Sequence, residues 1–358
     1  MTDDEGRLGD LPLRSYVPRP ALRRTVHDVP RARFPVVDVH AHLGRWLTGS
    51  WAAPDVSELV ATMDAANVAT IVNLDGAWGE ELRANLRRYD RAHPGRFVTF
   101  AQWDRRLFAE EDFGERLAAQ VHAAASGGAR GLKVWKDLGL HLRDPGGGLV
   151  MPHDERLEPV WDACAARAMP VLIHTGDPAA FFEPLDETNE RLEELLDHPD
   201  WWFGDRSRFP SFEELADSFE ALVTRRANVT FIGAHAGGLA EDLGRLGGML
   251  DTCPNLHVDI AARIAELGRV PRAAAALIAR FPDRFLFGSD GTPPLAEDYA
   301  SAFRFLETAD EHVPYSPDAV PPQGRWAISC LDLPEEVLGA IYSRNARRLI
   351  PGLDRVGG

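Results

Sequence analysis

The sequence predicts a closed (β/α)8 barrel, the TIM-barrel fold, and three observations support this class. Eight short apolar segments follow one another along the chain, each succeeded by the apolar spacing of an amphipathic helix. Most of these segments start about 30 residues apart, as expected for βα units in a parallel sheet, and eight units are the number that closes a TIM barrel. The turn after the first segment reads His-Ala-His-Leu-Gly. An open doubly wound sheet, the competing architecture, would usually carry a Gly-rich dinucleotide turn there.

The predicted strands are apolar runs that stop at polar or turn residues. They are expected at 34–40, 69–74, 97–103, 130–135, 170–174, 229–234, 256–260 and 284–290. Between them, apolar stripes predict helices. The first helix begins at Pro54-Asp55. Ser211 and Glu214 predict a capping box at the start of the helix that follows the long connection after the fifth strand. Further helices are expected at 271–281, near 295–309 and at 334–349.

The chain divides into an arm, one catalytic barrel and a tail. Residues 1–33 are rich in proline and arginine and lack periodicity, so we expect an arm packed on the outside of the fold. The barrel is expected over 34–350, and a tail over 351–358. The connection 176–210 is long and dense in aromatic residues. External packing would explain it, but long βα connections on the active face commonly act as lids.

Composition excludes several classes of protein. The 358 residues are 45% hydrophobic, and no apolar run approaches the ~20 residues of a membrane span. The acidic start shows no secretory signal, and three well-separated cysteines fit reduced thiols of a cytoplasmic protein. The net charge of −16 argues against nucleic acid or an anionic membrane as partner. We therefore expect a small-molecule substrate and leave a homodimer open.

The chemistry begins at His40 and His42, one residue apart at the end of the first strand. Strand side chains alternate faces, so both imidazoles are expected on the same side, where they can hold one metal ion such as Zn, Mn or Fe. Barrel enzymes carry their active sites at the carboxyl ends of the strands. Four more candidates lie there, in strands four, five, six and eight: Lys133, His174, His235 and Asp290. Barrel closure would bring Asp290 beside the two histidines.

Lysine usage singles out the fourth strand. Of 39 basic residues only Lys133 and Lys136 are lysines, and they lie three apart. Unlike arginine, lysine has an amine that can lose its proton and react. The alternative for Lys133 is an ordinary salt bridge in the barrel mouth, and Lys136 is expected to face outward or toward a loop.

This ordered set resembles the amidohydrolase superfamily of metal-dependent barrel enzymes, and within it the amidohydrolase-related branch. The resemblance runs from about His40 to Asn345-Ala346-Arg347-Arg348-Leu349. It implies that His40, His42 and Asp290 bind a first metal and that His174 is a further ligand. His235 would be a ligand of a second metal or a catalytic histidine. Lys133 resembles a lysine that two-metal members carbamylate into a bridging carboxylate, whereas many members of this branch lack it and hold one metal.

Two reaction classes remain open at this point. In the first, metal-activated water hydrolyses an amide, lactone or ester, with Asp290 moving the proton and His235 stabilising the oxyanion. Decarboxylation of an aromatic-type acid belongs to the same class of enzyme. The alternative is a nonheme iron or diiron oxygenase that hydroxylates an apolar small molecule, such as a secondary-metabolite intermediate, because two histidines and a carboxylate also suit Fe(II). The candidate substrate contacts are Trp46, Trp135, Phe181, Phe182 and Arg263.

Overall fold

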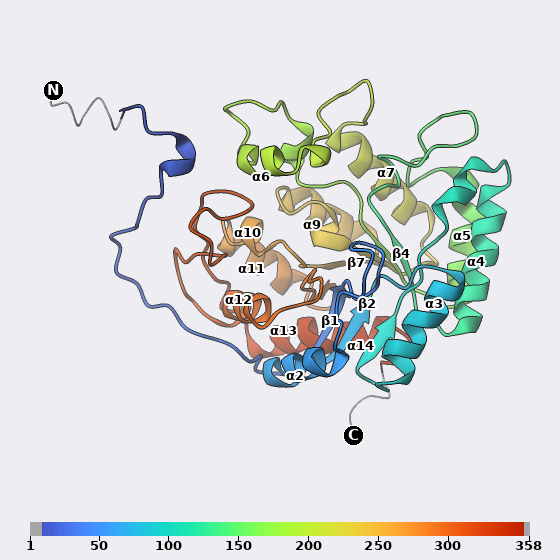
Figure 1. The fold of residues 1–358 in the computed structure, drawn as a ribbon, viewed down its shortest axis with the longest axis horizontal. Helices are drawn as coiled ribbons and strands as arrows, with labels where there is room; N and C mark the ends of the chain where they lie inside the picture. Colours follow the sequence, from blue (N-terminus) through green and yellow to red (C-terminus); the bar gives the residue numbers. More distant parts are fainter. Residues whose placement is uncertain (1–8, 354–358) are drawn as a thin grey trace.

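The protein, seen here in a computed structural model that describes residues 9–353, is a barrel of eight parallel strands with helices outside it (Figure 1). Every predicted strand is present, in most cases with fewer residues than expected. The strands are β1 Val36–Ala41, β2 Val68–Asn73, β3 Phe97–Thr99, β4 Leu132–Val134, β5 Val171–Ile173, β6 Phe231–Gly233, β7 Leu256–Asp259 and β8 Phe285–Leu286.

Backbone hydrogen bonds close the ring of strands. Strands β1–β2–β3 form one parallel ladder and β4 to β8 form another. Between β3 and β4, the Lys133 N–H donates to the Ala101 carbonyl at 2.7 Å, and at the other junction the Asp290 N–H donates to the His40 carbonyl at 2.7 Å. The first and last strands are therefore neighbours. The pairing of β1 with β2 shifts register between Asp38 and Ala41, around the first histidine.

Eight longer helices cover the outside of the barrel. They are α2 Val56–Ala66, α3 Gly79–Leu86, α4 Phe113–Gly127, α5 Glu158–Ala166, α7 Phe212–Arg225, α9 Leu243–Thr252, α11 Pro271–Arg280 and α12 Ala296–Glu307. Shorter helices are α6 Leu192–Asp197, α8 Ala234–Gly237, α10 Ile264–Leu267, α13 Glu335–Gly339 and α14 Asn345–Leu349. The predicted capping box is confirmed, since Ser211 and Glu214 bond to each other's backbone N–H. No helix among residues 9–353 is long and apolar enough to cross a membrane.

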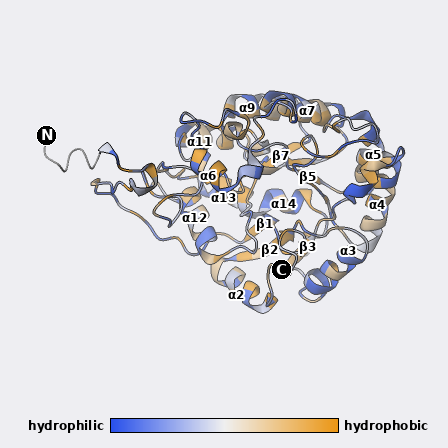
Figure 2. Ribbon diagram, turned by 45° about the horizontal axis from the view of Figure 1, so that its top comes forward, coloured by the Kyte–Doolittle hydropathy of each residue, from blue (hydrophilic) through white to orange (hydrophobic). Residues whose placement is uncertain are grey.

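The apolar core has an inner and an outer layer. Inside the barrel, side chains such as Val37, Leu172 and Ile232 pack together with Ile350 and Leu353 from the end of the chain. The outer layer lies between strands and helices, and Figure 2 shows the corresponding mixture of hydrophobic and hydrophilic residues along the surrounding helices. Because these two apolar layers stabilise the barrel, the carboxyl ends of the strands can hold polar side chains instead.

The connection 176–210 has an apolar core of its own. It contains η5 Ala179–Phe182, α6 and η6 Pro199–Trp201, and α6 lies at the edge of the barrel in Figure 1. Its buried residues pack against neighbouring loops as a separate cluster: Leu140, Phe181, Phe182, Leu195, Phe203, Phe209 and Leu215.

The arm differs in part from its prediction. Residues near its end are fastened to the body, with the His27 N–H donating to Asp310 at 2.7 Å and the Asn67 side chain donating to the Ala32 carbonyl at 2.9 Å. The preceding residues extend away from the body (Figure 1), and Leu13 and Leu22 are exposed. The Arg325 side chain also donates to the Tyr16 carbonyl, so the described part of the arm contacts the body at Tyr16 and again next to β1. Residues 1–8 and 354–358, which include most of the predicted tail, lie outside the described residues.

Candidate metal centre

Both histidines of the first strand present the same ring nitrogen to Asp290. His40 Nε2 and His42 Nε2 each lie 3.2 Å from Asp290 Oδ1. Their opposite nitrogens are occupied, because His40 Nδ1 lies 2.8 Å from Asp259 Oδ2 and His42 Nδ1 lies 2.9 Å from Asp75 Oδ1. A carboxylate can only accept, so each Nδ1 carries a proton, and each Nε2 offers a lone pair whenever the ring is neutral.

Two imidazole nitrogens thus face one carboxylate oxygen, and a positive charge among these three atoms stabilises the arrangement. In the protein without metal a proton fills that role. Although burial opposes it, Asp75 and Asp290 raise the pKa of His42 to about 9. The imidazoles of His40 and His235 hold the pKa of Asp290 well below its usual range, although burial acts in the opposite direction. Two imidazole nitrogens and a carboxylate oxygen are also a common donor set for divalent transition metals. The residues present therefore fit a metal ion.

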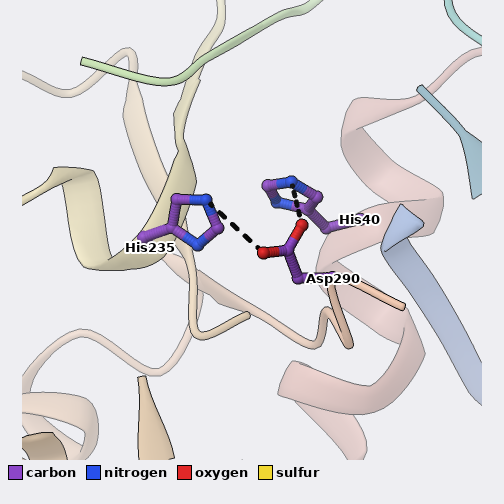
Figure 3. A group of neighbouring side chains, drawn as sticks. All are labelled: His40, His235 and Asp290. Carbon is purple, nitrogen blue, oxygen red and sulfur yellow. Dashed lines mark ion pairs between the residues drawn. The ribbon is translucent and has the colours of Figure 1, made fainter. Parts of the chain in front are cut away.

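His235 occupies the other side of the same carboxylate. Figure 3 shows Asp290 between the rings of His40 and His235, and His235 Nε2 lies 4.0 Å from Asp290 Oδ2. One ligand atom from each of these three residues lies within 4.8 Å of the others. His235 has a left-handed backbone, with φ of 59°, and its Nδ1 donates to the Ala261 carbonyl at 2.8 Å. Its Nε2 is therefore a lone-pair donor that faces the site. Burial lowers the pKa of His235 well below 6.5, which keeps the ring neutral.

His174 joins the cluster beside His235. The two rings are 4.4 Å apart, and burial lowers the pKa of His174 to about 4. His174 Nε2 is buried without a hydrogen-bond partner, 3.5 Å from Asp177 Oδ1. Lys136 forms an ion pair with the other oxygen of Asp177 at 2.5 Å. Lys136 therefore faces a loop, which is one of the two orientations expected from the sequence.

Lys133 is fully buried at the centre of the group. Its Nζ lies 3.3 Å from His40 Nε2 and 5.0 Å from the centre of the Trp135 ring. Burial lowers the pKa of Lys133 to about 8, against the opposing charges of Asp290, Asp259 and Asp75. Among the described residues it has no ion-pair partner within 4.0 Å. The ordinary salt bridge considered from the sequence is therefore not formed.

Sequence reasoning missed two aspartates that orient the histidines. Asp259, at the end of β7, accepts from His40 Nδ1, from the His235 N–H at 2.9 Å and from the Ala261 N–H at 3.1 Å. Asp75 follows β2 and accepts from His42 Nδ1. Partners of this kind fix the tautomer and direction of metal-binding histidines. The available signal was an aspartate at the end of an apolar run, in Leu74-Asp75 and Val258-Asp259.

The predicted substrate contacts fall into two groups. Trp135 stacks on His42 with ring centres 4.9 Å apart, and Trp46 lies edge-on to Trp135 at 5.8 Å. Arg263 follows β7, next to the segment that orients His40 and His235. Phe181 and Phe182 are only 2% and 8% exposed and pack inside the apolar cluster of the 176–210 connection. Trp135 and Trp46 therefore lie next to the histidines, whereas these two phenylalanines pack within the connection.

A comparison of the sequence with protein families finds one match. The family is described as Amidohydrolase, and its model matches residues 37–352. A search of curated proteins finds no match.

Solved structures with a similar fold include metal-dependent and uncharacterised barrels. A dihydroxybenzoic acid decarboxylase from Polaromonas sp. JS666, with bound manganese and 2-nitroresorcinol, has a TM-score of 0.57 at 15% identity and covers 88% of this chain and 96% of that one. A 5-carboxyvanillate decarboxylase from Novosphingobium aromaticivorans, complexed with manganese and a nitrobenzoic acid, has a TM-score of 0.55 at 14% identity, covering 91% and 99%. An uncharacterised TIM-barrel protein from Bordetella bronchiseptica has a TM-score of 0.53 at 14% identity, covering 90% and 100%.

Proposed function

The chain belongs to the amidohydrolase family, and from that premise we propose that it hydrolyses an amide, lactone or ester bond in a small organic molecule with the help of a divalent metal. One observation carries the proposal. The Nε2 atoms of His40 and His42 each lie 3.2 Å from the same oxygen of Asp290, while buried aspartates fix the opposite ring nitrogens. Histidines with a purely structural role at a strand end would not require both Nε2 atoms to face one carboxylate oxygen.

His40, His42 and Asp290 would hold the first ion, which we propose to be Zn, Mn or Fe. His174 and His235 are neutral nitrogen donors beside it, and Lys133 lies between the two groups. These side chains could hold a second ion as well, and a carbamylated Lys133 would then bridge the two metals. A bound divalent ion polarises a carbonyl and lowers the pKa of water to near 7.

Asp290 is the proposed proton carrier. Its side chain is 29% exposed, whereas those of His40 and His42 are 1% and 4% exposed. It is therefore the member of the set that a substrate would reach, and its lowered pKa keeps it ionised, which is the form that can accept a proton. It would then deliver that proton to the leaving group.

His235 takes a narrower role than the sequence suggested. Because its Nδ1–H is engaged by the Ala261 carbonyl, its Nε2 has no hydrogen to donate to an oxyanion. This supports His235 as a metal ligand or a proton acceptor in preference to an oxyanion donor. Trp135 and Trp46 would form the wall that excludes water from the reacting bond.

A second candidate is decarboxylation of an aromatic-type acid. It is favoured by the manganese-containing decarboxylases that share this fold, although at 14–15% identity these share the fold alone. The same metal ligands would serve, with the substrate's carboxylate as the reacting group.

The experiment that tests the proposal is a substrate panel run with metal control. The protein is stripped with a chelator, reloaded with Mn or Zn, and assayed on amides, lactones, esters and hydroxybenzoates. Metal-restored hydrolysis that Asp290→Asn abolishes supports the proposal. Release of CO2 from the acids alone would replace it with the lyase. Two irons per chain, with oxygen uptake coupled to hydroxylation, would replace it with the oxygenase.

A further inference from the structure

Arg263 is a buried cation without a counterion. The residue is 6% exposed, and among the described residues the one hydrogen bond of its side chain runs from Nη1 to the Ala262 carbonyl at 2.8 Å. Arg191, the other strongly buried arginine of residues 9–353, is by contrast paired with Glu194 and Glu266. A guanidinium carries five N–H donors, and burial of a charge is costly unless the charge is paired. Arg263 is thus prepared for an anionic partner that the chain itself does not supply.

Its position ties it to the metal centre. Arg263 ends the short segment after β7 in which Asp259 orients His40 and the Ala261 carbonyl orients His235. Arg263 lies two residues after Ala261, whose carbonyl accepts from His235 Nδ1 at 2.8 Å. The same segment therefore fixes the metal-facing histidines and places the arginine beside them.

The carboxylates around Arg263 stabilise its charge without contacting it. Four of them act from beyond ion-pair distance and together raise the pKa of the guanidinium despite its burial: Glu266, Glu241, Asp177 and Asp290. Three of the four have closer cationic partners. Glu266 pairs with Arg191, Asp177 pairs with Lys136, and Asp290 lies against the two histidines of β1. An incoming anion would therefore face little competition for the free N–H donors.

We propose that Arg263 binds a carboxylate of the substrate that is separate from the bond that is cleaved. The substrate class is then a small organic acid bearing an amide, lactone or ester, with the acid on the Arg263 side and the scissile carbonyl over Asp290. A planar guanidinium matches a carboxylate through two parallel N–H···O bonds, which fixes orientation as well as charge. This inference rests on the proposed function for the identity of the reaction, but the anion site itself does not need the metal.

The test uses benzoate and benzamide, which match in size and differ in charge, as probes of the metal-free protein. Isothermal titration calorimetry at low salt compares the wild type with Arg263→Met and Arg263→Lys. Arg269→Met is the matched control, since that arginine is exposed and paired with Glu190. Manganese binding is counted separately for each protein, so a failed metal site and a failed anion site are told apart.

The wild type and the control are expected to bind benzoate at least ten times more tightly than benzamide. Arg263→Met is expected to lose this preference while it still binds manganese. Arg263→Lys keeps the charge and the fold, and should bind benzoate at least threefold more weakly because an ammonium cannot form the parallel pair. Equal binding of the two probes by the wild type would overturn the inference, as would a Met variant that keeps the preference. A Lys variant with wild-type benzoate affinity would overturn it as well.

Discussion

Replacement of Asp259 by asparagine separates the metal site from the fold with a nearly isosteric change. In the wild type, Oδ1 of Asp259 accepts from the backbone N–H groups of His235 and Ala261, and Oδ2 accepts from His40 Nδ1. Asparagine can keep its carbonyl on the two N–H groups, which places its NH2 against His40. The imidazole must then accept at Nδ1, so its proton moves to Nε2 and removes the lone pair that faces Asp290.

The expected magnitude follows from these contacts. Both backbone hydrogen bonds are retained, so the unfolding free energy of metal-free protein should change by no more than about 1 kcal/mol. Metal affinity should fall about 10- to 100-fold, the range typical for loss of a carboxylate behind a metal-binding histidine. Competition with a fluorescent chelator measures the affinity, and urea unfolding in EDTA measures the stability.

Asp90→Asn is the matched control for this substitution. Asp90 is a partly buried aspartate that accepts from the backbone N–H and the hydroxyl of Thr99 and forms no hydrogen bond to the histidines of the candidate site. The control should leave metal affinity unchanged. A folded Asp259→Asn protein with wild-type metal affinity would refute the assignment of His40 Nε2 as a ligand.

Three further predictions concern separate features. His257 is buried with no hydrogen-bond partner on either ring nitrogen, and burial lowers its pKa from 6.5 to about 4. Because the unfolded chain binds this proton more tightly, the unfolding free energy should fall by up to about 3 kcal/mol as the pH is lowered from 6.5 to 4. Urea unfolding at a series of pH values should show a smaller fall for His257→Leu. Lys133→Ala should lose about one metal equivalent and recover activity in part with propionate, and wild-type protein in 13C-bicarbonate should show one carbamate carbon by NMR. Unchanged metal count and activity would leave Lys133 a simple cation. Phe181→Ala with Phe182→Ala should expose the 176–210 segment to protease, because each substitution removes about 3–5 kcal/mol of packing free energy. Cleavage rates equal to those of the wild type would exclude a packing role.

The order of strands was predictable because each strand is an apolar run followed by an amphipathic helix. Closure of the barrel then placed Asp290 next to His40 without further information. The spacing of His40 and His42 also predicted a shared direction, and both rings do face Asp290. These inferences depend on periodicity and on topology, which a single sequence carries.

The supporting contacts were not predictable in the same way. Asp259 and Asp75 act through hydrogen bonds to histidines 219 and 33 residues away in sequence. The left-handed backbone at His235 and the tautomer that follows from it have no sequence signature in a non-glycine residue. The packing of Phe181 inside the 176–210 connection depends on how that segment folds back on itself, which aromatic content alone does not indicate.

The most direct test of the account is anomalous diffraction from crystals soaked in manganese. We predict a peak at the carboxyl ends of the strands, about 2.0–2.3 Å from His40 Nε2, His42 Nε2 and an oxygen of Asp290, distances typical of nitrogen and oxygen ligands of divalent metals. The peak should be absent when His40 and His42 are both replaced by alanine in a protein that still folds. A manganese peak held by other residues, or an unchanged peak in the double variant, would contradict the metal centre on which the proposed function depends.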